Sequence, residues 1–288
     1  MKYQILIFFI IINTELLAQT EEEFVPVKKD TACYHYVFSP GDTITYRAVA
    51  LDSIIIDYGT PLLKTRYELI RIVCDSVNKL GHFFISQELI NSISEETWGD
   101  KEKVERIESP WIGRKVWYEI DSVGARYSFG VDDSTRAAMS PGGAFQPNII
   151  FPFKQFCKIT NESWSYSAIM DLPENGIPIP IERQNSLFRT MEPKDTLGYP
   201  CNRFQYVRTG QGSVSIVTND VKIYTSSVNV SNGVVFFHKQ YSIPVHYFAN
   251  IEQKLNIEMP DIGKQPGVHY MIINYTLDEY KPAIRKKK

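Results

Sequence analysis

The sequence lacks the features by which most enzymes and metal proteins are recognised. Its five histidines, His35, His82, His238, His246 and His269, include no pair at i, i+2 or i, i+4 spacing, and no two cysteines form a C-x-x-C motif. There is no G-x-S-x-G elbow and no Rossmann or P-loop glycine pattern. We therefore predict no catalytic residue, no metal ligand and no cofactor from the sequence.

An excess of one charge is also missing. The sequence has 31 lysines and arginines against 33 aspartates and glutamates, which leaves a net charge of -2. A nearly neutral molecule has no field that would attract nucleic acid, so we expect no nucleic-acid partner. The one basic run is the tail at 281–288 (KPAIRKKK). We expect a solvated, frayed end there, with a weak contact to anionic lipid as the alternative.

Long apolar runs are absent except at the N-terminus. Lys2 precedes the apolar run Ile5–Ile12, and a more polar stretch leads to Ala18. This layout predicts a signal peptide over residues 1–18, followed by a flexible leader over 19–32. An uncleaved anchor is the alternative, but a spanning helix needs about 20 apolar residues. We therefore expect a periplasmic or secreted protein of the bacterial envelope, with no transmembrane segment after signal removal.

The four cysteines are Cys33, Cys74, Cys157 and Cys201. In an oxidising compartment an even number of cysteines permits two disulfides, in any of three connectivities. Cys74 lies inside an apolar run, where a buried free thiol fits equally well. The sequence leaves these alternatives open.

Helical periodicity is scarce, and the best candidates, Thr135–Met139 and Ile149–Cys157, are short. Most of the chain instead alternates β-branched and aromatic runs with Gly, Pro, Asn and Asp. In His269–Leu277, for example, alternate residues form one more apolar and one more polar face, which is typical of antiparallel sheets. The predicted strands are Thr43–Ile56, Thr65–Asp75, Gly81–Ile90, Trp111–Asp121, Arg126–Val131, Phe204–Thr209, Val214–Val217, Val221–Val230, Val234–Tyr241, Val245–Met259 and His269–Leu277.

The predicted fold is mainly β, with one or more large curved antiparallel sheets and few short helices. The β domain covers residues 33–280, as an incomplete barrel or as two lobes at 33–150 and 151–280. A faint repeat, P-x-D-T-φ-x-Y at Pro40–Tyr46 and Pro193–Tyr199, supports two lobes unless it arose by chance. Three prolines make Asp171–Ile181 a loop or a sheet edge.

Glycine, asparagine and acidic pairs are interpreted as turn or rim residues. We predict turns at Gly210–Gly212 and at Val230–Val234, because Gly and Asn tolerate positive φ. The adjacent pairs Asp132–Asp133 and Glu95–Glu96 do not make converging acid–base pairs, because neighbours on a strand point to opposite faces. His238 and His246 could meet across a hairpin as a metal site, although ordinary sheet positions are the simpler interpretation.

Aromatic side chains provide the best candidate for a binding site. Trp111 and Trp117 share one face of a predicted strand whose other face is also apolar, so that strand is buried on both sides or faces a cavity. Core packing is one interpretation. The other is an apolar ligand pocket lined by Trp111, Trp117, Phe83, Tyr46 and Tyr67.

The signal peptide, the scarcity of helices, the one-sided strands, the proline-rich segment and the G-D-T-φ-x-Y opening at Gly41–Tyr46 together resemble LolA/LolB-like periplasmic proteins. Related bacterial envelope families of unknown function have the same sequence pattern. The resemblance implies a strongly curved antiparallel sheet, an incomplete barrel around an apolar cavity that carries lipid or acyl chains. It implies no particular site residue.

Three functional hypotheses follow. The first is an exported protein that is not an enzyme and binds a lipid or another apolar or amphipathic ligand in its curved sheet. The second is a structural or interaction module that docks an envelope protein through a strand edge or an aromatic patch. The third, which has the least support, is a hydrolase whose residues converge only in three dimensions.

Overall fold

The computed structural model describes residues 31–107, 109, 111–131, 148–154, 157–174, 177–218 and 221–283. These residues form fourteen β-strands. In this part of the chain no helix is long and apolar enough to cross a membrane. The predicted signal peptide, the helix candidate Thr135–Met139, the pair Asp132–Asp133 and most of the basic tail lie outside the described residues.

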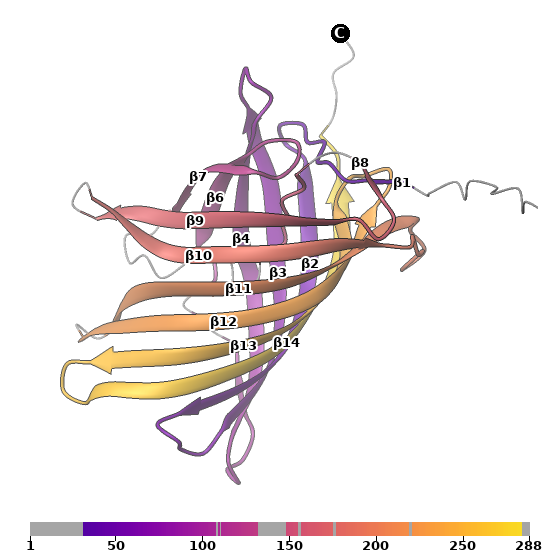
Figure 1. Cartoon of the computed structure of the whole chain (residues 1–288). Helices are drawn as coiled ribbons and strands as arrows, with labels where there is room; N and C mark the ends of the chain where they lie inside the picture. Colours follow the sequence, from indigo (N-terminus) through magenta and orange to yellow (C-terminus); the bar gives the residue numbers. More distant parts are fainter. Residues whose placement is uncertain are drawn as a thin grey trace, which may run out of the picture.

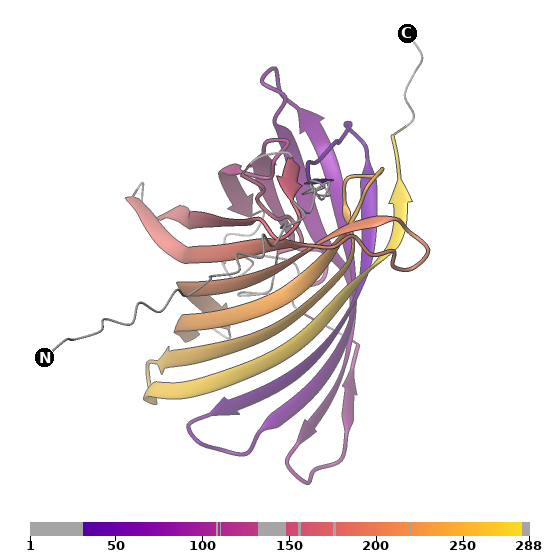
Figure 2. The ribbon, with the colours of Figure 1, turned by 45° about the vertical axis from the view of Figure 1, so that its right-hand side comes forward.

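Twelve strands form one antiparallel sheet (Figure 1). Its strands run nearly upright at β2 to β4 and nearly across the view at β9 to β12, so the sheet is strongly twisted and curved (Figures 1 and 2). From edge to edge the order is β7 (Arg126–Val131), β6 (Lys115–Ile120), β4 (Phe83–Trp98), β3 (Leu62–Val77), β2 (Thr43–Ile56), β14 (Gly263–Lys281), β13 (Pro244–Met259), β12 (Val221–His238), β11 (Cys201–Thr218), β10 (Ile177–Met191) and β9 (Ser163–Glu174), with β5 (Val104–Arg106) paired to β4.

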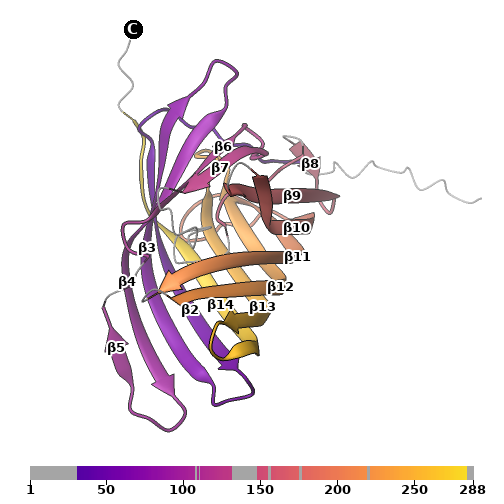
Figure 3. The same ribbon diagram turned by 90° about the vertical axis from the view of Figure 1, so that its left-hand side faces the viewer.

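The two edge strands of the sheet come close to each other. The backbone amide of Arg126 in β7 donates a hydrogen bond to the Tyr166 hydroxyl in β9, at 3.4 Å. Figure 3 shows β2, β3 and β4 as one wall and β10 to β13 as the other. The predicted curved antiparallel sheet and incomplete barrel are confirmed. The pairing of β2 with β14 joins the predicted 33–150 and 151–280 halves in one sheet.

Side chains alternate between two faces of this sheet, as the period of two requires. In β2 the buried positions run from Ile44 through every second residue to Asp52, while Val49 and Leu51 are exposed. We call the buried side the inner face and the other the outer face. Pairing continues the inner face across the sheet, since Met271 of β14 pairs with Asp52 and is also buried.

Aromatic side chains of the chain itself fill one half of the inner face. A small sheet of β1 (Thr31–Cys33) and β8 (Cys157–Ile159) lies beside this half of the inner face. Its two strands are joined by the Cys33–Cys157 disulfide. The next residues of the chain point their rings at the sheet. The Tyr34 ring packs 5.2 Å from Phe153 and 5.4 Å from Phe204. This half is therefore a packed core.

Several predicted turns are strands instead. β11 runs through Gly210–Gly212, and β12 runs without interruption through Val230–Val234. Gly233 has room for no side chain, because an added Cβ would meet the Tyr206 ring at 2.7 Å and the Phe248 carbonyl oxygen. The turn predictions were wrong because each glycine admits a neighbouring side chain within an extended strand, Tyr206 at Gly233 and Asn229 at Gly210.

One predicted helix is absent, whereas the proline-rich segment lies at an edge as predicted. The described residues of the helix candidate Ile149–Cys157 are not helical, and Cys157 begins β8. Asp171–Ile181 was predicted as loop or edge, and its described residues are the paired ends of β9 and β10, with β9 at the sheet edge. Proline is tolerated at an edge because no further strand needs its missing amide.

Candidate functional site

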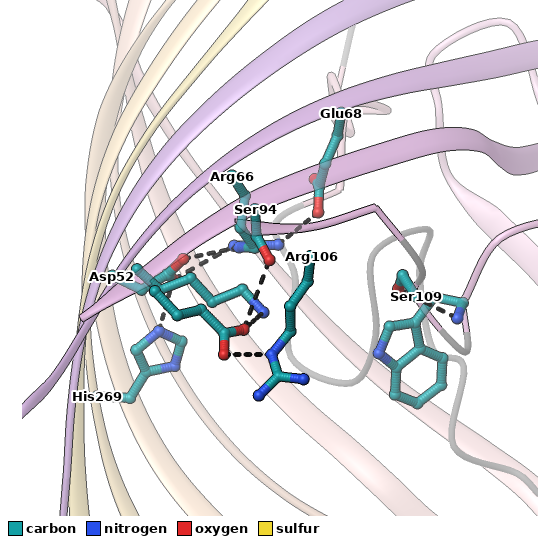
Figure 4. A network of polar contacts seen from close by, with 10 residues as sticks. Asp52, Arg66, Glu68, Ser94, Arg106, Ser109 and His269 are labelled. Atoms are coloured by element: carbon teal, nitrogen blue, oxygen red, sulfur yellow. Dashed lines mark hydrogen bonds and ion pairs between the residues drawn. The ribbon is translucent and has the colours of Figure 1, made fainter. Parts of the chain in front are cut away.

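The other half of the inner face is polar and contains a buried ionic cluster (Figure 4). Arg66 of β3 donates to both carboxylate oxygens of Asp52 in β2, at 2.7 and 3.3 Å, and to Glu68 at 2.6 Å. All three residues are nearly inaccessible, with exposed fractions of 5% for Asp52 and 6% for Arg66 and Glu68. Antiparallel pairing of β2 with β3 brings these inner-face positions together.

Mutual charge keeps this cluster ionised. Burial alone would raise the pKa of Asp52, but hydrogen bonds and charge from His269 and Arg66 outweigh it and hold that pKa below its ordinary value. Burial alone would lower the pKa of Arg66, but Glu68 and Asp52 raise it above its ordinary value. We interpret the cluster as a charged network whose members depend on one another.

His269 connects the cluster to β13. Its Nε2 lies 2.7 Å from Asp52 Oδ1, and its Nδ1 lies 3.0 Å from Gln253 Oε1. Both ring nitrogens are therefore occupied by neighbouring side chains. A general base needs a free nitrogen within reach of its substrate, so this aspartate–histidine pair is arranged for structure rather than for proton transfer.

A second ionic network lies toward the edge of β4. Glu96 contacts Lys64 at 2.9 Å and Arg106 of β5 at 2.6 Å, while its neighbour Glu95 contacts Lys103 at 2.5 Å. Burial alone would raise the pKa of Glu96, but the hydrogen bonds from Lys64 and Arg106 outweigh burial and lower it. The predicted separation of Glu95 from Glu96 is borne out, because the two carboxylates bind different partners.

A hollow of about 520 Å³ lies mainly on the outer face, across β14, β2, β3 and β4. Its apolar wall consists of Leu51, Leu63, Tyr270 and Ile272, which are 51%, 52%, 48% and 43% exposed. Strand pairing sets Leu51 directly beside Ile272. At the other end the hollow is lined by Thr97 and the Glu95–Lys103 pair. The hollow is therefore apolar on one side and ionic on the other.

The five aromatic residues predicted to line one pocket are divided between the two faces. Tyr46 and Phe83 are buried inside, where the Tyr46 hydroxyl donates to the Pro244 carbonyl at 2.8 Å and Phe83 packs against Phe38. Trp111 lies in a turn before β6 and packs, partly buried, against the core.

The other two predicted residues are exposed on the outer face. Trp117 is 39% exposed, and its ring lies over Gly130 of β7. Tyr67 is 46% exposed and pairs with Val49, two residues from Leu51 of the hollow. The structure thus places only Tyr67 beside the hollow, and the five residues do not surround one pocket.

The remaining candidates have local structural roles. His238 Nδ1 accepts backbone N–H groups of Gln240 and Tyr241, at 2.9 and 2.8 Å, and so closes a turn. Burial lowers the pKa of both His238 and His246. Among the described residues no three His, Cys, Asp or Glu side chains are placed to hold a metal ion. Cys74 and Cys201 are buried free thiols.

Comparison with known proteins identifies no family for this chain. No protein-family model matches it, and no curated protein matches it. Among solved structures, one of lipovitellin that concerns lipid–protein interactions in that protein is similar, with 13% identity and a TM-score of 0.47. The match covers 88% of this chain and 26% of the lipovitellin chain. A likeness this distant carries no functional argument.

Proposed function

We propose that this protein is not an enzyme and binds an amphipathic ligand in the outer-face hollow. The observation that carries the proposal is the apolar wall of Leu51, Leu63, Tyr270 and Ile272, whose side chains stand about half exposed around one concavity. Exposed apolar side chains gathered in one place are typical of ligand grooves and interaction sites. The volume of about 520 Å³ also falls in the range of small-molecule sites.

The distribution of polarity in the hollow favours a ligand with an apolar chain and a polar end. The apolar wall lies on β14, β2 and β3, and the Glu95–Lys103 pair lies at β4. Each methylene moved from water onto the apolar wall would contribute about 0.8 kcal/mol. A polar head group would meet the ion pair, which remains partly exposed to water.

The proposed compartment is the bacterial periplasm or the extracellular space. The Cys33–Cys157 disulfide supports this, because disulfides persist in oxidising compartments and are rare in the cytosol. The N-terminal signal-peptide pattern supports the same proposal independently.

Native mass spectrometry of protein purified from its host tests the proposal. The wild type should carry an adduct of lipid size. Leu63→Asp should lose it, because an apolar chain on the wall would strip the new carboxylate of its hydration. The matched control is Val207→Asp, at an equally exposed outer position on β11 outside the hollow. It should keep the adduct.

A wild-type mass without adduct, or an adduct that persists in Leu63→Asp, would contradict the proposal. A protein that copurifies with the wild type and is released by Leu63→Asp would also contradict it. That result would instead identify the surface as a docking site for an envelope partner. Thermal unfolding of both variants should show that each is folded.

A further inference from the structure

A buried arginine on the inner face has no acidic partner among the described residues. Arg208 of β11 is 6% exposed, and its Nε donates to the Ser186 hydroxyl of β10 at 3.1 Å. Its guanidinium carbon lies 5.2 Å from the centre of the Tyr206 ring. Both neighbours are uncharged, and no contact with a described residue uses the two terminal nitrogens.

Comparison with Arg66 shows how unusual this arrangement is. Both arginines lie on the inner face of the same sheet, and both are 6% exposed. Arg66 is neutralised by Asp52 and Glu68, whereas the partners of Arg208 in the described part of the chain are a hydroxyl and a ring. A largely buried charge without a counter-ion is less stable than a paired one, because much of its hydration is lost. An external anion would supply the missing charge.

Small polar residues flank Arg208 on the inner face, because Arg208 pairs with Ser186 of β10 and Ser231 of β12. The next two inner-face positions of β11 are Gly210 and Gly212, which pair with Asn229 and Ser227 of β12. The Asn229 side chain lies across Gly210, where an added Cβ would meet its oxygen at 2.7 Å. β10, β11 and β12 lie side by side in the sheet, so these residues form one continuous surface (Figure 1).

Two further donors lie on this surface. Asn229 is 6% exposed, and its side-chain amide lies across Gly210. Ser227 is 4% exposed, and its buried hydroxyl has no hydrogen-bond partner among the residues that the structure describes. Buried polar groups are normally satisfied, so the unsatisfied Ser227 hydroxyl indicates a missing partner. The amide and the hydroxyl can both donate to an oxygen.

We propose that Arg208 anchors an oxyanion-binding site on the inner face, with Asn229 as a second donor. The ligand group is a carboxylate or a phosphate, because a guanidinium fork binds two oxygens of such a group at once. The site is distinct from the outer-face hollow and does not depend on it. Because Gly210 has no side chain, the Asn229 side chain can lie across it, on the same face of β11 as Arg208.

Thermal unfolding at constant ionic strength tests this site with inorganic phosphate and with dihexanoyl phosphatidate. The wild-type midpoint should rise with either anion, because a ligand that binds the folded state stabilises it. Arg208→Met should show no such rise. Without anion, its midpoint should equal or exceed that of the wild type, because the uncompensated charge is gone. Arg189→Met, on the exposed side of β10, should respond like the wild type.

Calorimetric titration with the same two anions provides the second measurement. Asn229→Ala keeps the arginine and should weaken binding by about tenfold, as expected for one hydrogen bond to a charged group. Equal affinity for both anions would show that the free oxyanion is recognised, and tighter binding of phosphatidate would indicate a lipid head group. The proposal is overturned if the wild type binds neither anion, or if Arg208→Met binds as well as the wild type.

Discussion

The buried ionic cluster gives the sharpest test of how the polar half of the inner face is stabilised. Asp52→Asn keeps the size of the side chain but removes its charge, so Arg66 loses one of its two carboxylates and keeps Glu68 at 2.6 Å. Removing one partner of a buried ion pair typically costs about 3–5 kcal/mol. Because Glu68 remains, we expect the lower end, about 3 kcal/mol.

Urea unfolding followed by tryptophan fluorescence measures this loss in the free energy of unfolding. Thermal unfolding gives a second measure. At about 2–4 °C per kcal/mol for a chain of this size, the midpoint temperature of Asp52→Asn should lie about 6–12 °C below that of the wild type. Asp278→Asn is the matched control, since Asp278 pairs at 2.8 Å with Arg47, whose side chain is 73% exposed. A surface pair of this kind contributes about 0–1 kcal/mol.

The difference in free energy of unfolding between the wild type and Asp52→Asn depends on pH with a defined sign. The folded-state pKa of Asp52 is lowered, so its contribution is complete above the unfolded-state pKa of about 3.9 and is lost as the pH falls through the lower folded value. The wild type and Asp52→Asn should therefore converge below about pH 4. Two results would refute this reasoning. One is a difference in the free energy of unfolding of less than about 1 kcal/mol at neutral pH. The other is a difference that stays the same in acid.

Three further predictions concern packing and the cysteines. Gly233→Ala should cost about 2 kcal/mol in urea unfolding, because the added methyl would meet the tyrosine ring packed over it; a change within error would contradict this. Cys33→Ser should lower the free energy of unfolding by about 2–4 kcal/mol, and a reductant should then leave the variant's stability unchanged. Burial raises the pKa of Cys74 to about 12 and of Cys201 to about 11, so Ellman's reagent at mildly alkaline pH should modify neither thiol until denaturant is added. Rapid labelling of the folded protein would contradict their buried placement.

Local pattern was sufficient to predict the architecture. The period of two, β-branched residues and flanking glycine and proline predicted β2 with the bounds that it has, Thr43–Ile56. The residue pattern did not predict how far the long, curved strands continue. Gly233 was interpreted as a turn residue, yet it lies in mid-strand, because the ring that fills the space beside it comes from another strand. Sequence alone carries no signal of such a cross-strand contact.

The pocket prediction shows a second limit. Alternation tells which residues of one strand share a face, but it does not relate the faces of different strands until their register is known. Tyr46 and Tyr67 are both aromatic strand residues, yet they lie on opposite faces of the sheet. Pairing of β2 with β3 sets Val49, not Tyr46, beside Tyr67.

The ionic cluster could have been detected in part. Asp52 shares its face of β2 with Ile44 and Ala50, and Arg66 shares its face of β3 with Ile70. A charged residue in phase with an apolar stripe indicates a buried ionic position. The partner His269 could not have been found in this way, because 217 residues separate it from Asp52.

Nuclear magnetic resonance with a nitroxide-labelled fatty acid tests most directly whether an apolar chain lies in the outer-face hollow. The label broadens signals of nearby methyl groups. We predict broadening of Leu51, Leu63 and Ile272, which line the hollow, and sharp signals from Ile85 and Leu89 in the core. Broadening of Ile85 and Leu89 with Leu51 and Leu63 unchanged would place the ligand inside the sheet and contradict the account.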